Sequence, residues 1–193
     1  GVLYTLFMRF IGYRIHLNKA AIAVYPAHKQ VMSIDGEVVD YDVLFTTMPL
    51  DLLIGKMPDV PEVVREQTHH LHHSSGLIVG VGVQRPLDSS KCWVYFPEPS
   101  APFYRTTYLN NYSPHITPDP ERYHLLLTET SYSPHKHEDK TTIIDRVVQG
   151  LVNVQLLEPA DLDRIATTYL IDVDYSYPVP TIDRNRALGT IQP

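Results

Sequence analysis

Residues 75–85 alternate between branched apolar side chains and glycines, and this pattern constrains the fold more than any other feature of the chain. The odd-numbered positions from 77 to 83 are apolar (Leu77, Val79, Val81 and Val83), and most even-numbered positions are glycine. Because successive side chains of a strand point to opposite faces, the segment predicts a β-strand with one apolar face and one nearly bare face. Bare backbone on a strand indicates close approach by a packed element or by a ligand, and both alternatives stay open.

Further strands are predicted downstream at regular spacing. Strand-like stretches occupy 92–96, 103–111 and 123–132, and proline-rich turns separate them. Consecutive strands with short connections favour antiparallel pairing. Residues 141–157 have apolar positions at helical spacing, and a last strand is predicted over 165–173.

The amino-terminal part has a different pattern. Residues 1–17 mix apolar and basic side chains and suit a helix, and the pair Asp35-Gly36 predicts a turn between two short strands. Residues 41–47 form a short apolar run that predicts a buried strand, and 61–73 suit a helical connection. The chain is therefore predicted to be α+β, with a mostly antiparallel sheet and flanking helices.

Composition excludes several classes of function. A net charge of −6 leaves no excess of cations for general nucleic-acid binding. No apolar run approaches the roughly 20 residues that cross a bilayer, so no membrane partner is expected. The single cysteine, Cys92, excludes an intramolecular disulfide and fits a reducing cytoplasm.

The chain begins without Met or a signal pattern, and we expect it to be a segment of a longer protein.

Two motifs suggest sites that their surroundings do not support. The Gly-x-Gly run at 80–85 has Arg85 in place of the third glycine of a dinucleotide fingerprint, Pro86 follows at once, and no helix is predicted to begin there to receive a pyrophosphate. The histidines at 69–73 could share a helix face, but no acidic or cysteine ligand has matching spacing, so we assign no metal site. Three carboxylates receive no acid–base role: Glu98, Glu129 and Glu138.

Trp93, Tyr95 and Arg105 are the strongest candidates for a binding site. On a strand, Trp93 and Tyr95 point to the same face, and a proline-rich turn returns the chain to Arg105. A hairpin would place the guanidinium beside the indole and the phenol, which joins an aromatic platform to a bidentate donor for phosphate. The alternative is an aromatic core strand with an exposed arginine.

Four segments resemble, in order and spacing, the eukaryotic-type UDP-galactopyranose mutases, which are FAD-dependent members of the amine-oxidase-like flavoprotein superfamily. These segments are 74–83, 91–98, 102–107 and 111–114. Residues 35–51 are similar to the last strands of that family's FAD domain, and 149–153 and 177–181 match two later signatures. The resemblance implies that 1–73 are a remnant of the FAD-binding domain with short strands, and that 74–193 are the substrate domain.

The resemblance implies an isomerase that interconverts UDP-hexopyranose and UDP-hexofuranose. In that family N5 of the reduced flavin is the nucleophile, and NADPH or another donor first reduces the FAD, so no residue of this chain is assigned as catalytic. The family's glycine-rich FAD loop lies amino-terminal to anything present here. The isolated chain is therefore expected to hold no FAD and to be inactive.

Carried over by position, four residues are implied to contact a UDP-sugar. Trp93 matches an aromatic residue at the substrate pocket, and Arg105 matches an arginine that clamps the pyrophosphate. Tyr95 and Tyr177 match tyrosines that contact phosphate. Self-association is also expected, through surfaces that a segment of a longer protein exposes. Two alternatives stay open: an amine-oxidase-like FAD oxidoreductase with another substrate, and a non-catalytic sugar-nucleotide-binding module.

Overall fold

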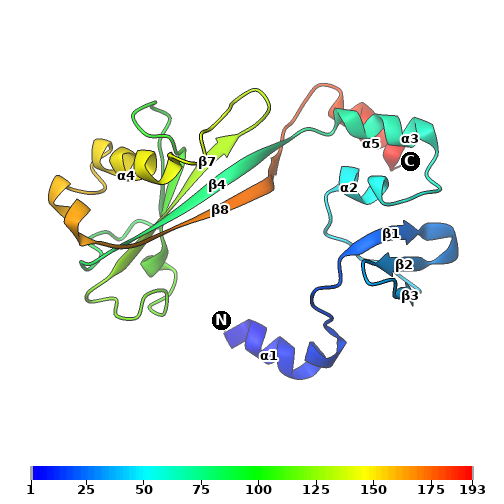
Figure 1. Cartoon of the computed structure of the whole chain (residues 1–193), viewed down its shortest axis with the longest axis horizontal. Helices are drawn as coiled ribbons and strands as arrows, with labels where there is room; N and C mark the ends of the chain where they lie inside the picture. The colour runs from blue at the N-terminus through cyan, green and yellow to red at the C-terminus, as the bar shows by residue number, and fades with distance from the viewer. Residues whose placement is uncertain (1, 193) are drawn as a thin grey trace. The chain divides into compact units, whose positions relative to one another are not determined.

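The computed structural model describes residues 2–192, and its contacts divide the chain into two units. One unit joins Gly1–Leu71 to Thr181–Pro193, and the other is His72–Pro180 (Figure 1). Gly1 and Pro193, where the predicted domains begin and end, lie outside the described residues.

The carboxyl-terminal segment lies in a different unit from the one predicted. The family resemblance implied a substrate domain over 74–193, whereas residues 181–193 join the first unit. The reason is local packing: helix α5 (Arg184–Ile191) contacts helix α3 (Glu62–Gln67), and Ala187 of α5 is fully buried.

The first unit contains short helices and a small sheet. Its α-helices are α1 (Val2–Ile11), α2 (Leu50–Gly55), α3 and α5, with 3₁₀ turns at Gly12–Arg14, Pro26–His28 and Thr68–His70. Its three-stranded antiparallel sheet consists of β1 (Ala21–Tyr25), β2 (Gln30–Ser33) and β3 (Val38–Asp40). The predicted turn is present between β2 and β3, where Gly36 adopts a φ of 84° that glycine accepts without strain. None of the helices within residues 2–192 has the length and apolarity to cross a bilayer.

The strand predicted over 41–47 is wrong. That run has no strand in the structure, and Val43 and Phe45 are 70% and 93% exposed. A strand satisfies its backbone N–H and C=O groups only when it pairs with a neighbour. Within residues 2–192 the small sheet ends at β3, and no strand pairs with this run.

The second unit is built on a five-stranded antiparallel sheet with the order β5-β6-β7-β4-β8. The strands are β4 (His73–Val83), β5 (Trp93–Tyr95), β6 (Arg105–Tyr108), β7 (His124–Tyr132) and β8 (Ile165–Pro178). The predicted α+β class is confirmed. The order differs from the chain order because β4 inserts between β7 and β8 (Figure 1).

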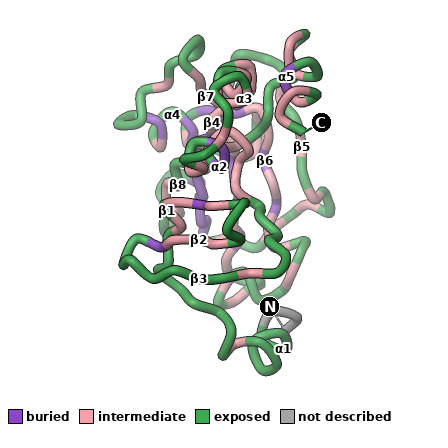
Figure 2. Tube along the Cα trace, turned by 90° about the vertical axis from the view of Figure 1, so that its right-hand side faces the viewer, coloured by how far each residue is buried: buried purple, intermediate pink, exposed green. Residues whose placement is uncertain are grey.

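The apolar face of β4 forms the core of this unit. Helix α4 (Ile143–Asn153) packs against it, and Figure 2 shows the most buried stretches along β4 and its neighbours. The core residues that β4 and α4 contribute are Leu77, Val79, Val81, Val83, Ile143, Val147 and Leu151. The strand and the helix were both predicted from spacing, and the 3.6-residue period of α4 matches its buried stripe.

The bare face of β4 is covered by its neighbour β8. A Cβ atom at Gly80 would overlap the ring of Tyr169, and one at Gly82 would lie 2.8 Å from Cγ2 of Thr167. Each glycine is the direct ladder partner of the residue that covers it. Of the two alternatives for this face, the structure shows the packed element.

At Gly150, close packing and helix propensity have opposite effects on the stability of an alanine variant. It lies in α4, and a Cβ there would lie 2.8 Å from Cδ of Pro102 and 3.1 Å from Cβ of Ala101. Helix propensity favours alanine by about 1 kcal/mol, but overfilling a packed contact costs about 1–3 kcal/mol. We expect Gly150→Ala to lower the free energy of unfolding, measured by urea denaturation.

The matched control for this prediction is Gly189→Ala in α5. No heavy atom lies within 4 Å of a Cβ placed at Gly189, so only the propensity gain remains. This variant should leave stability unchanged or raise it. If both alanine variants shift the urea midpoint in the same direction, the packing argument for Gly150 fails.

His124 is a buried ring at the start of β7. It is 1% exposed, and its Nδ1 lies 2.8 Å from the carbonyl oxygen of Arg85. Because a carbonyl only accepts, Nδ1 carries the hydrogen and Nε2 of the neutral ring keeps the lone pair. Burial lowers the pKa of His124 below its ordinary value of 6.5, although the hydrogen bond to Arg85 opposes the shift. The folded chain therefore resists a protonation that the unfolded chain accepts.

This depressed pKa predicts a loss of stability on acidification. Below pH 6.5 the unfolded state binds the extra proton, so the free energy of unfolding should fall by up to about 1.4 kcal/mol per pH unit from this group. His124→Asn still offers an N–H to the carbonyl of Arg85 and has nothing to titrate, so its loss should be smaller. Urea denaturation at pH 7.5 and 5.5 measures both. Identical losses in the two proteins would contradict the assignment.

Candidate functional site

Arg105 begins strand β6 and lies between two ladder partners. The register places it opposite Tyr95 of β5 on one side and Glu129 of β7 on the other. Paired residues of antiparallel strands point to the same face, so all three side chains share one face of the sheet. The structure therefore brings the guanidinium and the Tyr95 phenol together, as the hairpin interpretation expected.

Glu129 fixes the orientation of this guanidinium. Nε of Arg105 donates to Oε1 at 2.7 Å, and Nη2 donates to Oε2 at 2.7 Å. The two side chains are only 25% and 13% exposed, so the bidentate pair is largely shielded from water. Glu129 was not among the residues predicted to form the site. Its position in the sequence could have indicated a role, because a carboxylate in a strand of apolar residues and threonines needs a hydrogen-bonding or charged partner.

The opposite edge of the guanidinium faces two phenols. Nη1 of Arg105 donates to the hydroxyl of Tyr95 at 3.2 Å, and Nη2 lies 3.4 Å from the hydroxyl of Tyr177. Glu129 occupies the Nε/Nη2 edge and the two phenol oxygens occupy the Nη1/Nη2 edge, so an incoming oxyanion would meet the phenol O–H groups first and the guanidinium N–H groups as those contacts open. That arrangement suits phosphate.

Tyr177 reaches this site through an irregularity in the β4–β8 ladder. Two steps along β4, from Gly76 to Ser74, match four steps along β8, from Val173 to Tyr177. Hydrogen bonds from the hydroxyls of Ser75 and Ser74 to carbonyls of β8 hold the irregular stretch. Since the shift is by an even number of residues, Tyr177 stays on the face that carries Arg105.

An open groove of about 410 Å³, the arginine groove, lies at this edge. Its lining residues are Tyr95, Tyr104, Arg105, Ser131 and Tyr177. The hydroxyl of Tyr104 donates to Oε2 of Glu129 at 2.8 Å, and burial together with this carboxylate raises the pKa of Tyr104, so the phenol remains protonated. Burial opposes the charge of Arg105, but its hydrogen bonds to Glu129 and Tyr95 outweigh that effect and raise its pKa.

Trp93 lies beside the groove without lining it. It precedes Tyr95 by two residues on β5 and shares its face, but its ladder partner is Thr107. Its side chain is 53% exposed. The structure thus brings three of the four predicted residues together and leaves the indole as an adjacent aromatic surface.

The Gly-x-Gly run and the histidine cluster do not have the geometry that a dinucleotide site or a shared-helix metal site would need. Gly80 and Gly82 are in the middle of β4, not at a strand-to-helix turn. His69 lies in a 3₁₀ turn whereas His73 begins β4 and stacks on Tyr175 with ring centroids 3.8 Å apart, so the two imidazoles share no helix face. Within the described part of the chain, no group of three or more potential ligands could hold a metal ion.

No family model matches the chain. A solved structure does: a reduced UDP-galactopyranose mutase superposes with a TM-score of 0.89 and 30% sequence identity over 100% of this chain. This chain is similar to UDP-galactopyranose mutase throughout. The resemblance predicted from the sequence is confirmed. The chain spans 42% of that mutase's length.

Other solved structures share the fold of this mutase-like chain at lower identity. A putative protoporphyrinogen oxidase from Exiguobacterium sp. 255-15 has a TM-score of 0.59 and 16% identity over 84% of this chain and 35% of its own. A CLA-producing fatty acid isomerase from P. acnes has a TM-score of 0.59 and 15% identity over 91% of this chain and 40% of its own. At these identities they indicate a common fold only, and it serves both an oxidase and isomerases.

The Arg105–Glu129 pair should be strongly coupled. Glu129→Leu leaves a guanidinium that is three-quarters buried without its carboxylate, and we expect the free energy of unfolding to fall by about 2–4 kcal/mol. The double variant Arg105→Met/Glu129→Leu should recover most of this loss, because neither charge is left unpaired. Urea denaturation of both single variants and of the double variant measures the coupling.

Tyr95→Phe is the control for this cycle. It removes one hydrogen bond to Arg105 and keeps the ion pair, so its cost should be within about 1 kcal/mol. If the losses of Arg105→Met and Glu129→Leu simply add in the double variant, the two side chains are not coupled and the proposed orienting contact is refuted.

Proposed function

We propose that the second unit forms the diphosphate-binding face of a UDP-galactopyranose mutase-like enzyme, which interconverts UDP-hexopyranose and UDP-hexofuranose. The observation that carries this proposal is the Nη1/Nη2 edge of Arg105, held by Glu129 and flanked by the hydroxyls of Tyr95 and Tyr177. The similarity to the mutase supports the choice of substrate class.

The groove would recognise the diphosphate mainly by directed hydrogen bonds. A diphosphate near neutral pH carries roughly two negative charges, and Arg105 brings one positive charge that Glu129 already balances. The oxygens of Tyr95 and Tyr177 already accept from Nη1 and Nη2 of Arg105, so the two phenol O–H groups act as donors to the ligand, and the guanidinium N–H groups join them when these contacts open. Trp93 offers an aromatic surface beside them for the rest of the ligand. The remaining charge requires a cation from outside this groove.

The described residues do not fit the diphosphate of FAD. Within residues 2–192, no glycine-rich turn leads from a strand into a helix, and the Gly-x-Gly run is covered by β8. In this proposal the flavin, and its reduction by NADPH or another donor, depend on residues outside this chain. The first unit would belong to the FAD-binding domain, and the chain alone would bind a nucleotide sugar without converting it. The single Cys92 supports a cytoplasmic enzyme.

Calorimetry with UDP tests the proposal. Arg105→Lys keeps a positive charge beside Glu129 but loses the planar fork, so UDP affinity should fall about tenfold. Tyr95→Phe and Tyr177→Phe should each weaken binding about threefold, because each removes one hydroxyl. Arg122→Ala changes an exposed arginine outside the groove and serves as the matched control.

The proposal predicts a dependence on phosphate as well as on Arg105. Uridine without phosphates should bind more weakly than UDP by about tenfold or more. Equal affinity of wild type and Arg105→Lys for UDP would refute the role of the guanidinium. Failure of the wild-type chain to bind UDP at millimolar concentration would refute the proposal as a whole.

A further inference from the structure

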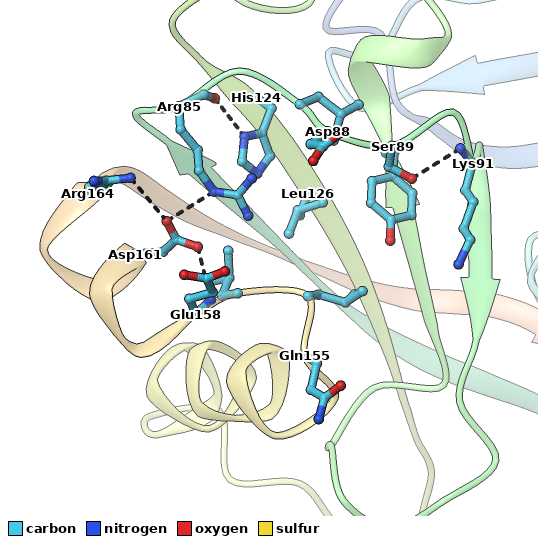
Figure 3. Close-up of a pocket in the computed structure, with 14 residues that line it drawn as sticks. Arg85, Asp88, Ser89, Lys91, His124, Leu126, Gln155, Glu158, Asp161 and Arg164 are labelled. Atoms are coloured by element: carbon cyan, nitrogen blue, oxygen red, sulfur yellow. Dashed lines mark hydrogen bonds and ion pairs between the residues drawn. The ribbon is translucent and has the colours of Figure 1, made fainter.

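A second cavity of about 480 Å³ lies in the same unit and shares no lining residue with the arginine groove (Figure 3). It lies where the end of β4, the start of β7 and the 3₁₀ helix η5 (Pro159–Arg164) meet. Its volume is within the range of small-molecule sites. Nothing in the proposed mutase function uses it.

Arg85 is held in this cavity from both of its ends. Its carbonyl oxygen bonds to the buried His124, and its Nε donates to Oδ1 of Asp161 at 3.0 Å. Asp161 is itself 2% exposed and accepts the backbone N–H of Glu158 through Oδ2 at 3.0 Å. Burial opposes ionisation of Asp161, but the bonds from Glu158 and Arg85 prevail and lower its pKa, so the carboxylate stays charged.

This anchoring leaves the other edge of the Arg85 guanidinium available. Within residues 2–192, the Nη1 and Nη2 atoms of Arg85 make no hydrogen bond. Arg105 differs, because its Nη1 and Nη2 already donate to the hydroxyls of Tyr95 and Tyr177. A guanidinium with one edge fixed and one edge free is prepared to bind an oxyanion.

The rest of the lining combines two further cations with hydrogen-bond acceptors. Arg164 lies on the Asp161 side, with its Nη1 3.8 Å from Oδ1 of that carboxylate. Lys91 lies across the cavity from Arg85 in Figure 3, and its ammonium has no ion pair or hydrogen bond among the described residues. Asp88, Glu158 and the neutral ring of His124 line the cavity as acceptors. Carboxylates would repel a bare anion, but they accept hydrogen bonds from hydroxyl groups.

We propose that this cavity binds a small phosphorylated polyhydroxy compound of the size of a hexose monophosphate. Its phosphate lies on the Nη1/Nη2 edge of Arg85, and Lys91 supplies the second positive charge. Its hydroxyl groups donate to Asp88 and the other acceptors of the lining. The proposal stands independently of UDP binding at Arg105.

Calorimetry with glucose 6-phosphate, inorganic phosphate and glucose as separate probes tests this site. Glucose 6-phosphate should bind the wild-type chain more tightly than either of the other two probes, because only it engages both the cations and the acceptors. Lys91→Met should weaken its binding about tenfold, since an exposed lysine without partners can be removed without disturbing the fold. Arg85→Lys keeps the charge beside Asp161 and should weaken binding similarly through loss of the fork.

Arg105→Lys separates this proposal from the proposed function. It should leave glucose 6-phosphate binding unchanged while reducing UDP binding, and Lys91→Met should do the reverse. If glucose 6-phosphate binding falls in Arg105→Lys and persists in Lys91→Met, the ligand occupies the arginine groove and this proposal is overturned. Absence of binding by the wild-type chain, or equal affinity for glucose 6-phosphate and inorganic phosphate, would also overturn it.

Discussion

The cross-strand contact between β4 glycines and β8 side chains determines the rest of the second unit. Gly80 and Gly82 remove side chains where Tyr169 and Thr167 must lie, and the opposite parity of β4 is fully apolar and buried under α4. One strand thereby provides both the core and the contact surface for its neighbour. Because the ladder runs along the whole length of β4, the pairing continues to the start of β4, where Tyr177 lies opposite Ser74.

Local features of the site were accessible from the sequence, and those that depend on strand order were not. The pairing of Tyr95 with Arg105 follows from a hairpin whose two strands are consecutive, so alternation and a turn signal were sufficient. Glu129 joins them through the β6–β7 register, which alternation alone does not determine. Tyr177 comes from β8, and only the family resemblance indicated it.

The failed strand prediction and the docking of the carboxyl-terminal helix have the same physical origin. The run at 41–47 has the composition of a buried strand, but a strand also needs a partner, and composition does not reveal whether one is present. Residues 181–193 follow the last strand directly, yet their helix packs against α3. Helix spacing and glycine alternation predicted α4 and β4 correctly because each pattern depends on one element alone. Strand pairing and helix docking each depend on two elements, and the sequence of one does not determine them.

The irregular stretch of β8 also limits which changes of length the family could tolerate. Side chains alternate along a strand, so inserting or removing one residue between Val173 and Tyr177 would turn that phenol toward the α4 side of the sheet. Arg105 would then face a single hydroxyl, although every residue type of the site would still be present. Natural variation in the length of this stretch should therefore occur in steps of two residues. A relative with a one-residue gap there would bind its ligand without the second phenol.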